Sequence, residues 1–306
     1  MNPIAITVAA ALALATPLRA QLPEPEALAR ELMRDVEALA HDSMEGRRIG
    51  TPGGARAREY LSRALAATGV ARLGDSWTQP FEARRDTLVL RGANLIGVVR
   101  GTARPGRYLV VTAHYDHVGV LRGQVYNGAD DNASGTAALL ALARAVARRP
   151  LAHSVLFVLL DGEEGGLTGA RHFVANAPVP LESIVVNVNL DMVGRNDRNE
   201  LYAAGTSHYP ALRPVLDSVA ARAPIALRFG HDRPGIQGED DWTTQSDHAA
   251  FHARGIPFVY FGEEDHPDYH RPTDDAERLM PAFFAGAVAT IHDALRALDR
   301  RFAAAR

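Results

Sequence analysis

The stretch Ser154-Val155-Leu156-Phe157-Val158-Leu159-Leu160 is followed at once by Asp161-Gly162-Glu163-Glu164. A continuous apolar run of this length is typical of a strand that is buried on both faces, as in the middle of a parallel sheet. Glu163 and Glu164 come just after the strand, and in open α/β sheets binding sites lie beyond the carboxyl ends of the strands. This stretch therefore predicts a sheet and a site at its edge.

Strands and helices alternate along most of the chain. Further strands are predicted at residues 87–90, 94–98, 108–112, 184–189 and 258–261, and helices at 28–40, 55–67, 133–147, 168–176, 209–221, 249–253 and 281–302. Residues 42–54 and 230–244 are expected to form loops. This order favours an α/β fold with a mostly parallel, twisted sheet and helices on both of its faces. Since no internal repeat or low-complexity linker is present, we expect residues 21–306 to form a single domain.

The composition excludes several classes of chemistry. The 306 residues carry a formal net charge of −3, so nothing in the overall charge suggests nucleic-acid binding. Cysteine is absent, which removes thiol nucleophiles, disulfides and thiolate metal sites. Lysine is absent as well, so a Schiff-base lysine and a phosphate-loop lysine are excluded. Chemistry must come from His, Asp, Glu, Ser, Tyr or a bound ion.

Residues 1–20 are expected to be a signal peptide. The apolar run from Ile4 to Thr16 is shorter than the ~20 residues that span a bilayer, and Ala20 offers a cleavage point before Gln21. No Lys or Arg precedes the run, which leaves a disordered tail or a first helix as alternatives. We expect an exported protein, periplasmic or secreted, without stable membrane insertion.

Four more segments place a metal-ligating side chain near the end of a strand or the start of a helix. His114 follows the strand 108–112, Asp191 follows 184–189, His270 follows 258–261 across a loop, and Asp131 precedes the helix 133–147. A single Asp after a strand is usually a turn residue or a helix cap. Two histidines and several carboxylates at one edge of a sheet can instead converge, which is the composition of a two-metal hydrolytic centre.

The ligand candidates lie in a series of motifs, which are His114-Tyr115-Asp116, Gly128-Ala129-Asp130-Asp131-Asn132-Ala133-Ser134-Gly135, Asp161-Gly162-Glu163-Glu164-Gly165, Asn189-Leu190-Asp191-Met192, Ser246-Asp247-His248-Ala249-Ala250-Phe251 and His270-Arg271-Pro272-Thr273-Asp274. In this order the motifs resemble the signature of the M28 zinc aminopeptidase family, and the resemblance runs from about Asp42 to the C-terminus. The resemblance implies a phosphorylase/hydrolase-like fold of the zinc exopeptidase type. Residues 21–306 would then be one zinc peptidase catalytic domain.

The resemblance also implies a set of metal ligands. Asp131 would bridge two ions, His114 and Asp191 would complete one site, and Glu164 and His270 would complete the other. Nitrogen and oxygen ligands together suit two Zn²⁺ ions, with Mn²⁺ or Co²⁺ as alternatives. The net positive charge of such a centre would hold a bridging water as hydroxide near neutral pH.

The neighbouring residues have more than one interpretation. Glu163 is expected to be the general base, as in the family, although a solvated loop acid is the simpler alternative. Asp116 can accept the second N–H of His114, or it can cap a turn. His117 is open between a substrate contact and a loop residue without function. Asp247 is a candidate to support the site, whereas His248 is as well explained as a surface or packing residue. No role is assigned to His153, His172, His208, His231 and His266.

These expectations combine into an exported dinuclear zinc aminopeptidase, a hydrolase that removes N-terminal residues from peptides with a free N-terminus. The first alternative is a glutaminyl cyclase-like acyltransferase, which shares the fold but works with one zinc. The second is a non-catalytic receptor-like domain, although relatives of that kind typically lose ligands. The preference for particular substrate side chains would be set by the loops within residues 195–245, whose sequence does not reveal that preference.

Overall fold

The computed structural model describes residues 22–85, 88–235 and 240–304. The expected signal peptide, residues 1–20, and the expected first mature residue, Gln21, lie outside this part. No helix among the described residues is both long enough and apolar enough to cross a membrane.

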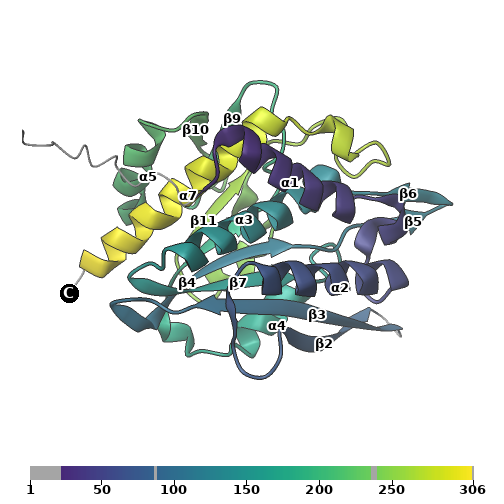
Figure 1. The fold of residues 1–306 in the computed structure, drawn as a ribbon, viewed down its shortest axis with the longest axis horizontal. Coiled ribbons are helices and arrows are strands. Elements are labelled where there is room, and N and C mark those ends of the chain that lie inside the picture. The colour runs from purple at the N-terminus through teal and green to yellow at the C-terminus, as the bar shows by residue number, and fades with distance from the viewer. Residues whose placement is uncertain (1–21, 86–87, 236–239, 305–306) are drawn as a thin grey trace, which may run out of the picture.

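A mixed sheet forms the centre of the molecule (Figure 1). Its strands are β1 (Ala71–Arg72), β2 (Thr78–Arg85), β3 (Leu88–Val99), β4 (Arg104–His114), β7 (His153–Leu160), β8 (Ile184–Leu190), β9 (Glu200–Ala204), β10 (Ala226–Phe229) and β11 (Phe258–Gly262). They lie in the order β1-β3-β7-β4-β8-β11-β9-β10, and β2 also pairs with β3, along residues 88–95. The inner strands β7, β4, β8 and β11 are parallel to one another, whereas β3 and β9 run antiparallel to their inner neighbours. The predicted α/β class is confirmed.

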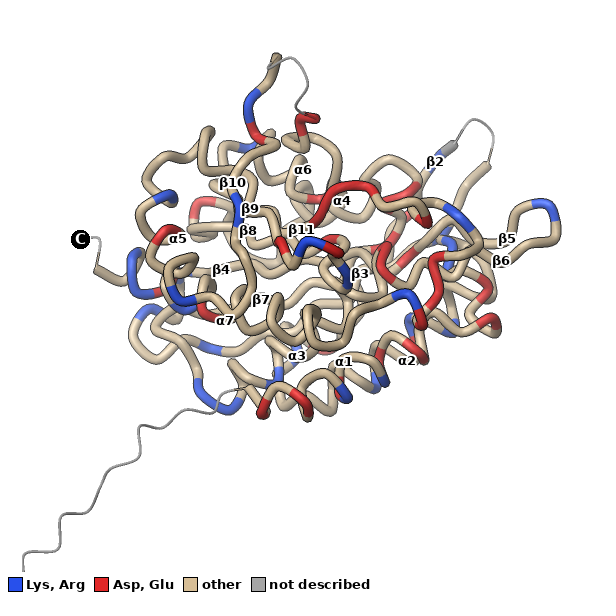
Figure 2. The backbone as a smooth tube through the Cα atoms, turned by 90° about the horizontal axis from the view of Figure 1, so that it is seen from above, with Lys and Arg blue, Asp and Glu red and all other residues tan. Residues whose placement is uncertain are grey.

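Helices cover both faces of the sheet, and Figure 2 shows them above and below the strands. The seven α-helices of the described residues are α1 (Pro25–Leu39), α2 (Pro52–Ala67), α3 (Gly135–Arg148), α4 (Thr168–Ala175), α5 (Arg213–Ala220), α6 (His248–His252) and α7 (Pro281–Ala304). Leu109 and Val111 of β4 belong to the same core cluster as α1, α2, α3, α5 and α7. Val110, between them, belongs to the cluster with α4 and α6. This alternation follows from the period of two in a strand and explains the continuous apolar sequence.

Several elements differ from the sequence prediction. The strands predicted at 87–90 and 94–98 are parts of one strand, β3, and β2, β9 and β10 were not predicted. A two-stranded ribbon, β5 (Gly119–Leu121) with β6 (Gln124–Tyr126), was also missed. These strands are short or alternate charged residues with few apolar ones, so their pattern resembles that of loops. The region 195–245 therefore contains two outer strands of the sheet, β9 and β10, in addition to the predicted helix and loops.

The inner strands end at one edge of the sheet. His114 at the end of β4 lies opposite Leu160 at the end of β7, and Phe261 of β11 lies opposite Leu190 of β8. Thr112 of β4 pairs in turn with Asn189 of β8. Because all four strands run in the same direction, the loops that follow them meet beyond this edge.

Candidate metal centre

Two groups of potential metal ligands lie beyond the carboxyl ends of the inner strands, and they share Asp131. We call the first the His114 cluster; it consists of His114, Asp131 and Asp191. His114 Nε2 lies 3.4 Å from Asp131 Oδ1 and 3.2 Å from Asp191 Oδ1. All three side chains are buried at the ends of their segments.

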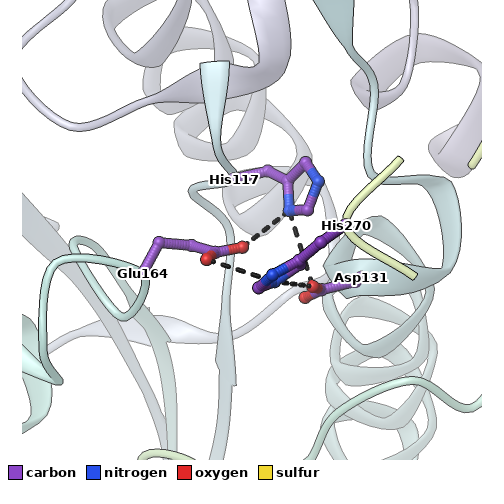
Figure 3. Close-up of side chains that lie close together, drawn as sticks. All are labelled: His117, Asp131, Glu164 and His270. Carbon is purple, nitrogen blue, oxygen red and sulfur yellow. Dashed lines mark ion pairs between the residues drawn. The ribbon is translucent and has the colours of Figure 1, made fainter. Parts of the chain in front are cut away.

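The second group is the His270 cluster: His117, Asp131, Glu164 and His270 (Figure 3). His270 Nε2 lies 3.0 Å from Asp131 Oδ2 and 3.3 Å from Glu164 Oε2. His117 Nδ1 lies 2.7 Å from Glu164 Oε1 and 3.6 Å from Asp131 Oδ2. Asp131 thus turns Oδ1 toward the His114 cluster and Oδ2 toward the His270 cluster, which is the arrangement a bridging carboxylate requires.

The structure brings all five sequence-predicted ligands together and adds His117. The sequence left His117 open, because a histidine in a loop carries no signal of its own. The available hint was its position three residues after His114, in the same loop that follows β4. Its side chain is fully buried, so it is not a solvent-exposed loop residue.

The chemistry of these side chains suits divalent metal ions. Glu164 Oε1 and both ring nitrogens of His117 are buried without a hydrogen-bond partner. Buried polar atoms without partners are unfavourable, and here they are ligand atoms that converge with carboxylate oxygens. Imidazole nitrogens together with carboxylate oxygens form a ligand set that binds Zn²⁺ well. The residues present therefore fit the two ions that the sequence predicts.

The charged side chains of the His270 cluster shift one another's pKa values, as expected for a metal site. Contact with the carboxylates of Asp131 and Glu164 raises the pKa of His270 to about 10. Although burial opposes it, contact with His117 and His270 lowers the pKa of Glu164. The carboxylates thus create a strongly negative site that holds a proton on an imidazole. A dication competes for the same lone pair and releases that proton when it binds.

Asp116 organises the site through two different groups. His114 Nδ1 lies 3.1 Å from the main-chain oxygen of Asp116, so Nδ1 donates to that oxygen and Nε2 is the nitrogen that faces the carboxylates of the cluster. The carboxylate, predicted to make this contact, has an oxygen 3.8 Å from His114 Nδ1. Instead it accepts the main-chain N–H groups of Glu163 and Glu164, with N···O distances of 3.0 and 3.3 Å. The carboxylate therefore fixes the turn that carries the acidic pair.

Hydrogen bonds also hold the other two carboxylate ligands. The Asp274 carboxylate accepts the N–H of Asp131 at 3.1 Å, which anchors the loop before α3. Ser246 Oγ donates to Asp191 Oδ2 at 2.6 Å and accepts from Asn189 Nδ2 at 2.9 Å. Both contacts lie within motifs that carry the family resemblance, although the sequence did not reveal what they do.

A buried arginine that the sequence placed in a loop holds the same region together. Arg47 lies in the 3₁₀ segment Asp42–Arg47, and its guanidinium donates to four main-chain oxygens, those of Leu39, Tyr115, Asn127 and Gly128. Burial lowers the pKa of Arg47 to about 10, against the attraction of Asp131 and other nearby acids. The group remains a cation at neutral pH and ties together the loops that carry His117 and Asp131.

A third group of titratable residues, Asp130, Glu263 and His266, lies next to Asp131. Asp130 Oδ2 lies 3.4 Å from His266 Nε2. Burial and the neighbouring Asp130 raise the pKa of Glu263 to about 12. Asp130 Oδ1 accepts the N–H of Gly194 at 2.8 Å. These contacts stabilise the backbone next to the bridging residue.

Two cavities meet at Glu164. The first, of about 290 Å³, is lined by ligands of both clusters together with Glu163, Trp242 and Tyr269. The second, of about 320 Å³, has Arg48, Ile49 and Leu90 in its wall and is also lined by Glu164. Burial and the nearby carboxylates of Asp247 and Asp191 raise the pKa of Glu163, whereas His114 lowers it. Glu163 thus faces the cavity in which a substrate would meet the metal ligands.

Comparison with known proteins agrees with this geometry. The Peptidase family M28 model matches residues 94–295. Aminopeptidase YwaD of Bacillus subtilis (strain 168) is 33% identical over 226 residues, which are 67% of this chain and 45% of that protein. The chain therefore spans less than half of the length of this relative.

Two solved structures share the fold. A zinc aminopeptidase from Bacillus subtilis superposes with a TM-score of 0.71 at 18% identity, covering 87% of this chain and 94% of that one. A Porphyromonas gingivalis glutaminyl cyclase also gives a TM-score of 0.71, at 20% identity, covering 90% of this chain and 99% of that one. At these identities the likeness shows the fold alone. The family match covers more than half of the 306 residues and includes every ligand of the two clusters, and the chain belongs to Peptidase family M28.

Proposed function

We propose that this chain is an exported dinuclear zinc aminopeptidase. The single observation that carries the proposal is Asp131, whose two carboxylate oxygens face two separate groups of ligands. A mononuclear enzyme needs only one such group. When bound, two zinc ions polarise the scissile carbonyl and lower the pKa of a water molecule.

Glu163 is the proposed general base and acid. Its side chain lines the cavity beside both clusters, and its main-chain N–H is held by the Asp116 carboxylate. It is not in either group of ligands, in contrast to the adjacent Glu164. A carboxylate in this place can take a proton from the attacking water and give it to the leaving amine.

Charges in the cavity favour a substrate with a free amine. Glu163 and Asp265 line it in addition to the ligands, and no arginine is among its described lining residues. Arg195, the cation expected nearby, has its Nη1 2.7 Å from Asp268 Oδ2. It is therefore neutralised rather than poised to bind a substrate carboxylate. Such a negative pocket favours an ammonium group over a C-terminal carboxylate.

The test compares one peptide with a free N-terminus and the same peptide with an N-acetyl group. We expect the acetylated peptide to be cleaved at least about tenfold more slowly, which corresponds to about 1.4 kcal/mol of transition-state binding. Equal cleavage of both peptides, or cuts at internal bonds, would rule out an aminopeptidase.

A glutaminyl cyclase is the second candidate, because a solved cyclase shares this fold. Elemental analysis separates the two proposals: an aminopeptidase of this kind holds two ions per chain at saturating zinc, and the cyclase holds one. Cyclisation of an N-terminal glutamine without any peptide hydrolysis would assign the chain to the cyclases.

A further inference from the structure

We propose that His117 is a fourth protein ligand in the His270 cluster and that it makes the two metal sites unequal. The His270 cluster then holds its ion first and loses it last. The ion in the His114 cluster, with three protein ligands, is the exchangeable one and has the open coordination position. This inference rests on the proposed two-metal function and adds an order of binding to it.

The position of His117 matches that of His270. Each places one ring nitrogen near an oxygen of Glu164 and near Asp131 Oδ2, at 2.7 and 3.6 Å for His117 and at 3.3 and 3.0 Å for His270. Ligand atoms around a tetrahedral Zn²⁺ with bonds of about 2.0–2.2 Å are separated by about 3.3–3.6 Å. The four side chains already approach this spacing.

A hydrogen bond does not account for the contact between His117 and Glu164. Although Nδ1 is 2.7 Å from Glu164 Oε1, both atoms lack a partner with hydrogen-bond geometry. His117 is also the one histidine in the described part of the chain with both ring nitrogens buried and unpartnered. By contrast, the buried His153 has Nδ1 2.8 Å from Asp299 Oδ1, and the buried His248 has Nε2 2.8 Å from the Trp242 carbonyl oxygen.

The imidazole of His117 is held in place before any ion arrives. Gly128 lies against it: a Cβ at position 128 would be 2.4 Å from His117 Cγ and 2.5 Å from Cδ2. Arg47 donates to the carbonyl oxygens of both Tyr115 and Gly128, on either side of this contact. A ligand that is already in position loses little conformational entropy on binding, which increases affinity.

The number of protein ligands in each cluster determines the order in which we expect the two metal ions to bind. Four protein ligands complete a tetrahedral shell, as in structural zinc sites, whereas three leave the open position of catalytic sites. His117, Asp131, Glu164 and His270 supply four. Since Asp131 is shared, the first ion in the His270 cluster also fixes the carboxylate that completes the His114 cluster.

The experiment titrates metal-free protein with Co²⁺, in competition with a coloured chelator, and compares wild type, His117→Ala, His117→Asn and His292→Ala. His292 is buried in α7 and controls for the loss of any buried imidazole. Circular dichroism and thermal unfolding of each metal-free variant report whether it is folded. For wild type we expect two equivalents, with the first bound at least about tenfold more tightly than the second.

In His117→Ala, we expect the first equivalent to bind at least about tenfold more weakly and the visible Co²⁺ spectrum of that step to change, because one nitrogen ligand is lost. His117→Asn should recover part of the affinity through its amide oxygen, and His292→Ala should match wild type. Two equivalents with the same stepwise affinities in His117→Ala and in wild type would overturn the role of His117 alone. One equivalent in saturated wild type would overturn the two-metal function itself.

Discussion

Arg47→Met should unfold more easily than any single change of a surface charge. The substitution removes the guanidinium that donates to the oxygens of Leu39, Tyr115, Asn127 and Gly128, while keeping a long apolar side chain. Each buried acceptor that loses its donor costs about 1–3 kcal/mol. The Gly128 oxygen keeps one donor, the N–H of Ala133 at 3.2 Å.

Removing the buried charge of Arg47 offsets part of this loss in the free energy of unfolding. Burial lowers the pKa of Arg47 from 12.5 to about 10. At 1.36 kcal/mol for each pKa unit, this corresponds to about 3 kcal/mol of unfavourable burial that Arg47→Met relieves. Four lost hydrogen bonds outweigh that gain, and we expect a net destabilisation of about 5 kcal/mol, near the upper end of the range for a broken buried charge network.

The assay is urea unfolding of the metal-free protein, followed by circular dichroism. The matched control is Arg48→Met, because Arg48 is the next residue, lies in a cavity wall and is only half-buried. We expect Arg48→Met to stay within about 0.5 kcal/mol of wild type. Arg47→Lys should be intermediate, since one ammonium cannot reach four separate oxygens. Equal stability of Arg47→Met and Arg48→Met would show that the four hydrogen bonds do not stabilise the fold.

Three further predictions concern catalysis, acid stability and processing. Glu163→Gln should keep its metal but lose about 10²–10⁴ in turnover, whereas Glu164→Gln should lose metal affinity, and equal metal loss in both would reject their separate roles. Burial lowers the pKa of His292 to about 4, so between pH 6.5 and 4 the unfolded chain binds a proton that the folded chain does not. The free energy of unfolding should therefore fall as the pH drops through this window, and His292→Gln should remove up to about 3 kcal/mol of that fall. Equal slopes of unfolding free energy against pH in wild type and in His292→Gln would contradict this prediction. N-terminal sequencing of protein from the native host should begin at Gln21, and a chain beginning at Met1 would exclude this processing.

The inner strands could be predicted because the residues within each strand are sufficient to indicate that it is buried. Residues 154–160 are apolar on both faces, and only a strand between two layers of helices needs such a sequence. The edge strand β2 could not be predicted in the same way. Its buried Phe81 and Ala83 alternate with polar and charged residues, and its partner is β3, so the pattern alone resembles a loop.

The candidate site was predictable where ligands directly follow strands, as Glu164 and Asp191 do. It was not predictable where a side chain acts across a long sequence separation. Arg47 reaches carbonyl oxygens 68 and 81 residues away, at Tyr115 and Gly128, and no local pattern encodes such contacts. His117 could be recognised only from the position of its ring beside carboxylates that come from two other loops.

The space at position 128 sets a limit on sequence variation. Gly128 has φ of +58°, and a Cβ there would lie 2.1 Å from the main-chain oxygen of Asp131 as well as 2.4 Å from the ring of His117. Every amino acid other than glycine carries that atom. A library of variants randomised at position 128 and selected for retention of zinc should therefore return glycine. The metal centre thus fixes a residue that is not itself a metal ligand, through the volume that Asp131 and His117 occupy.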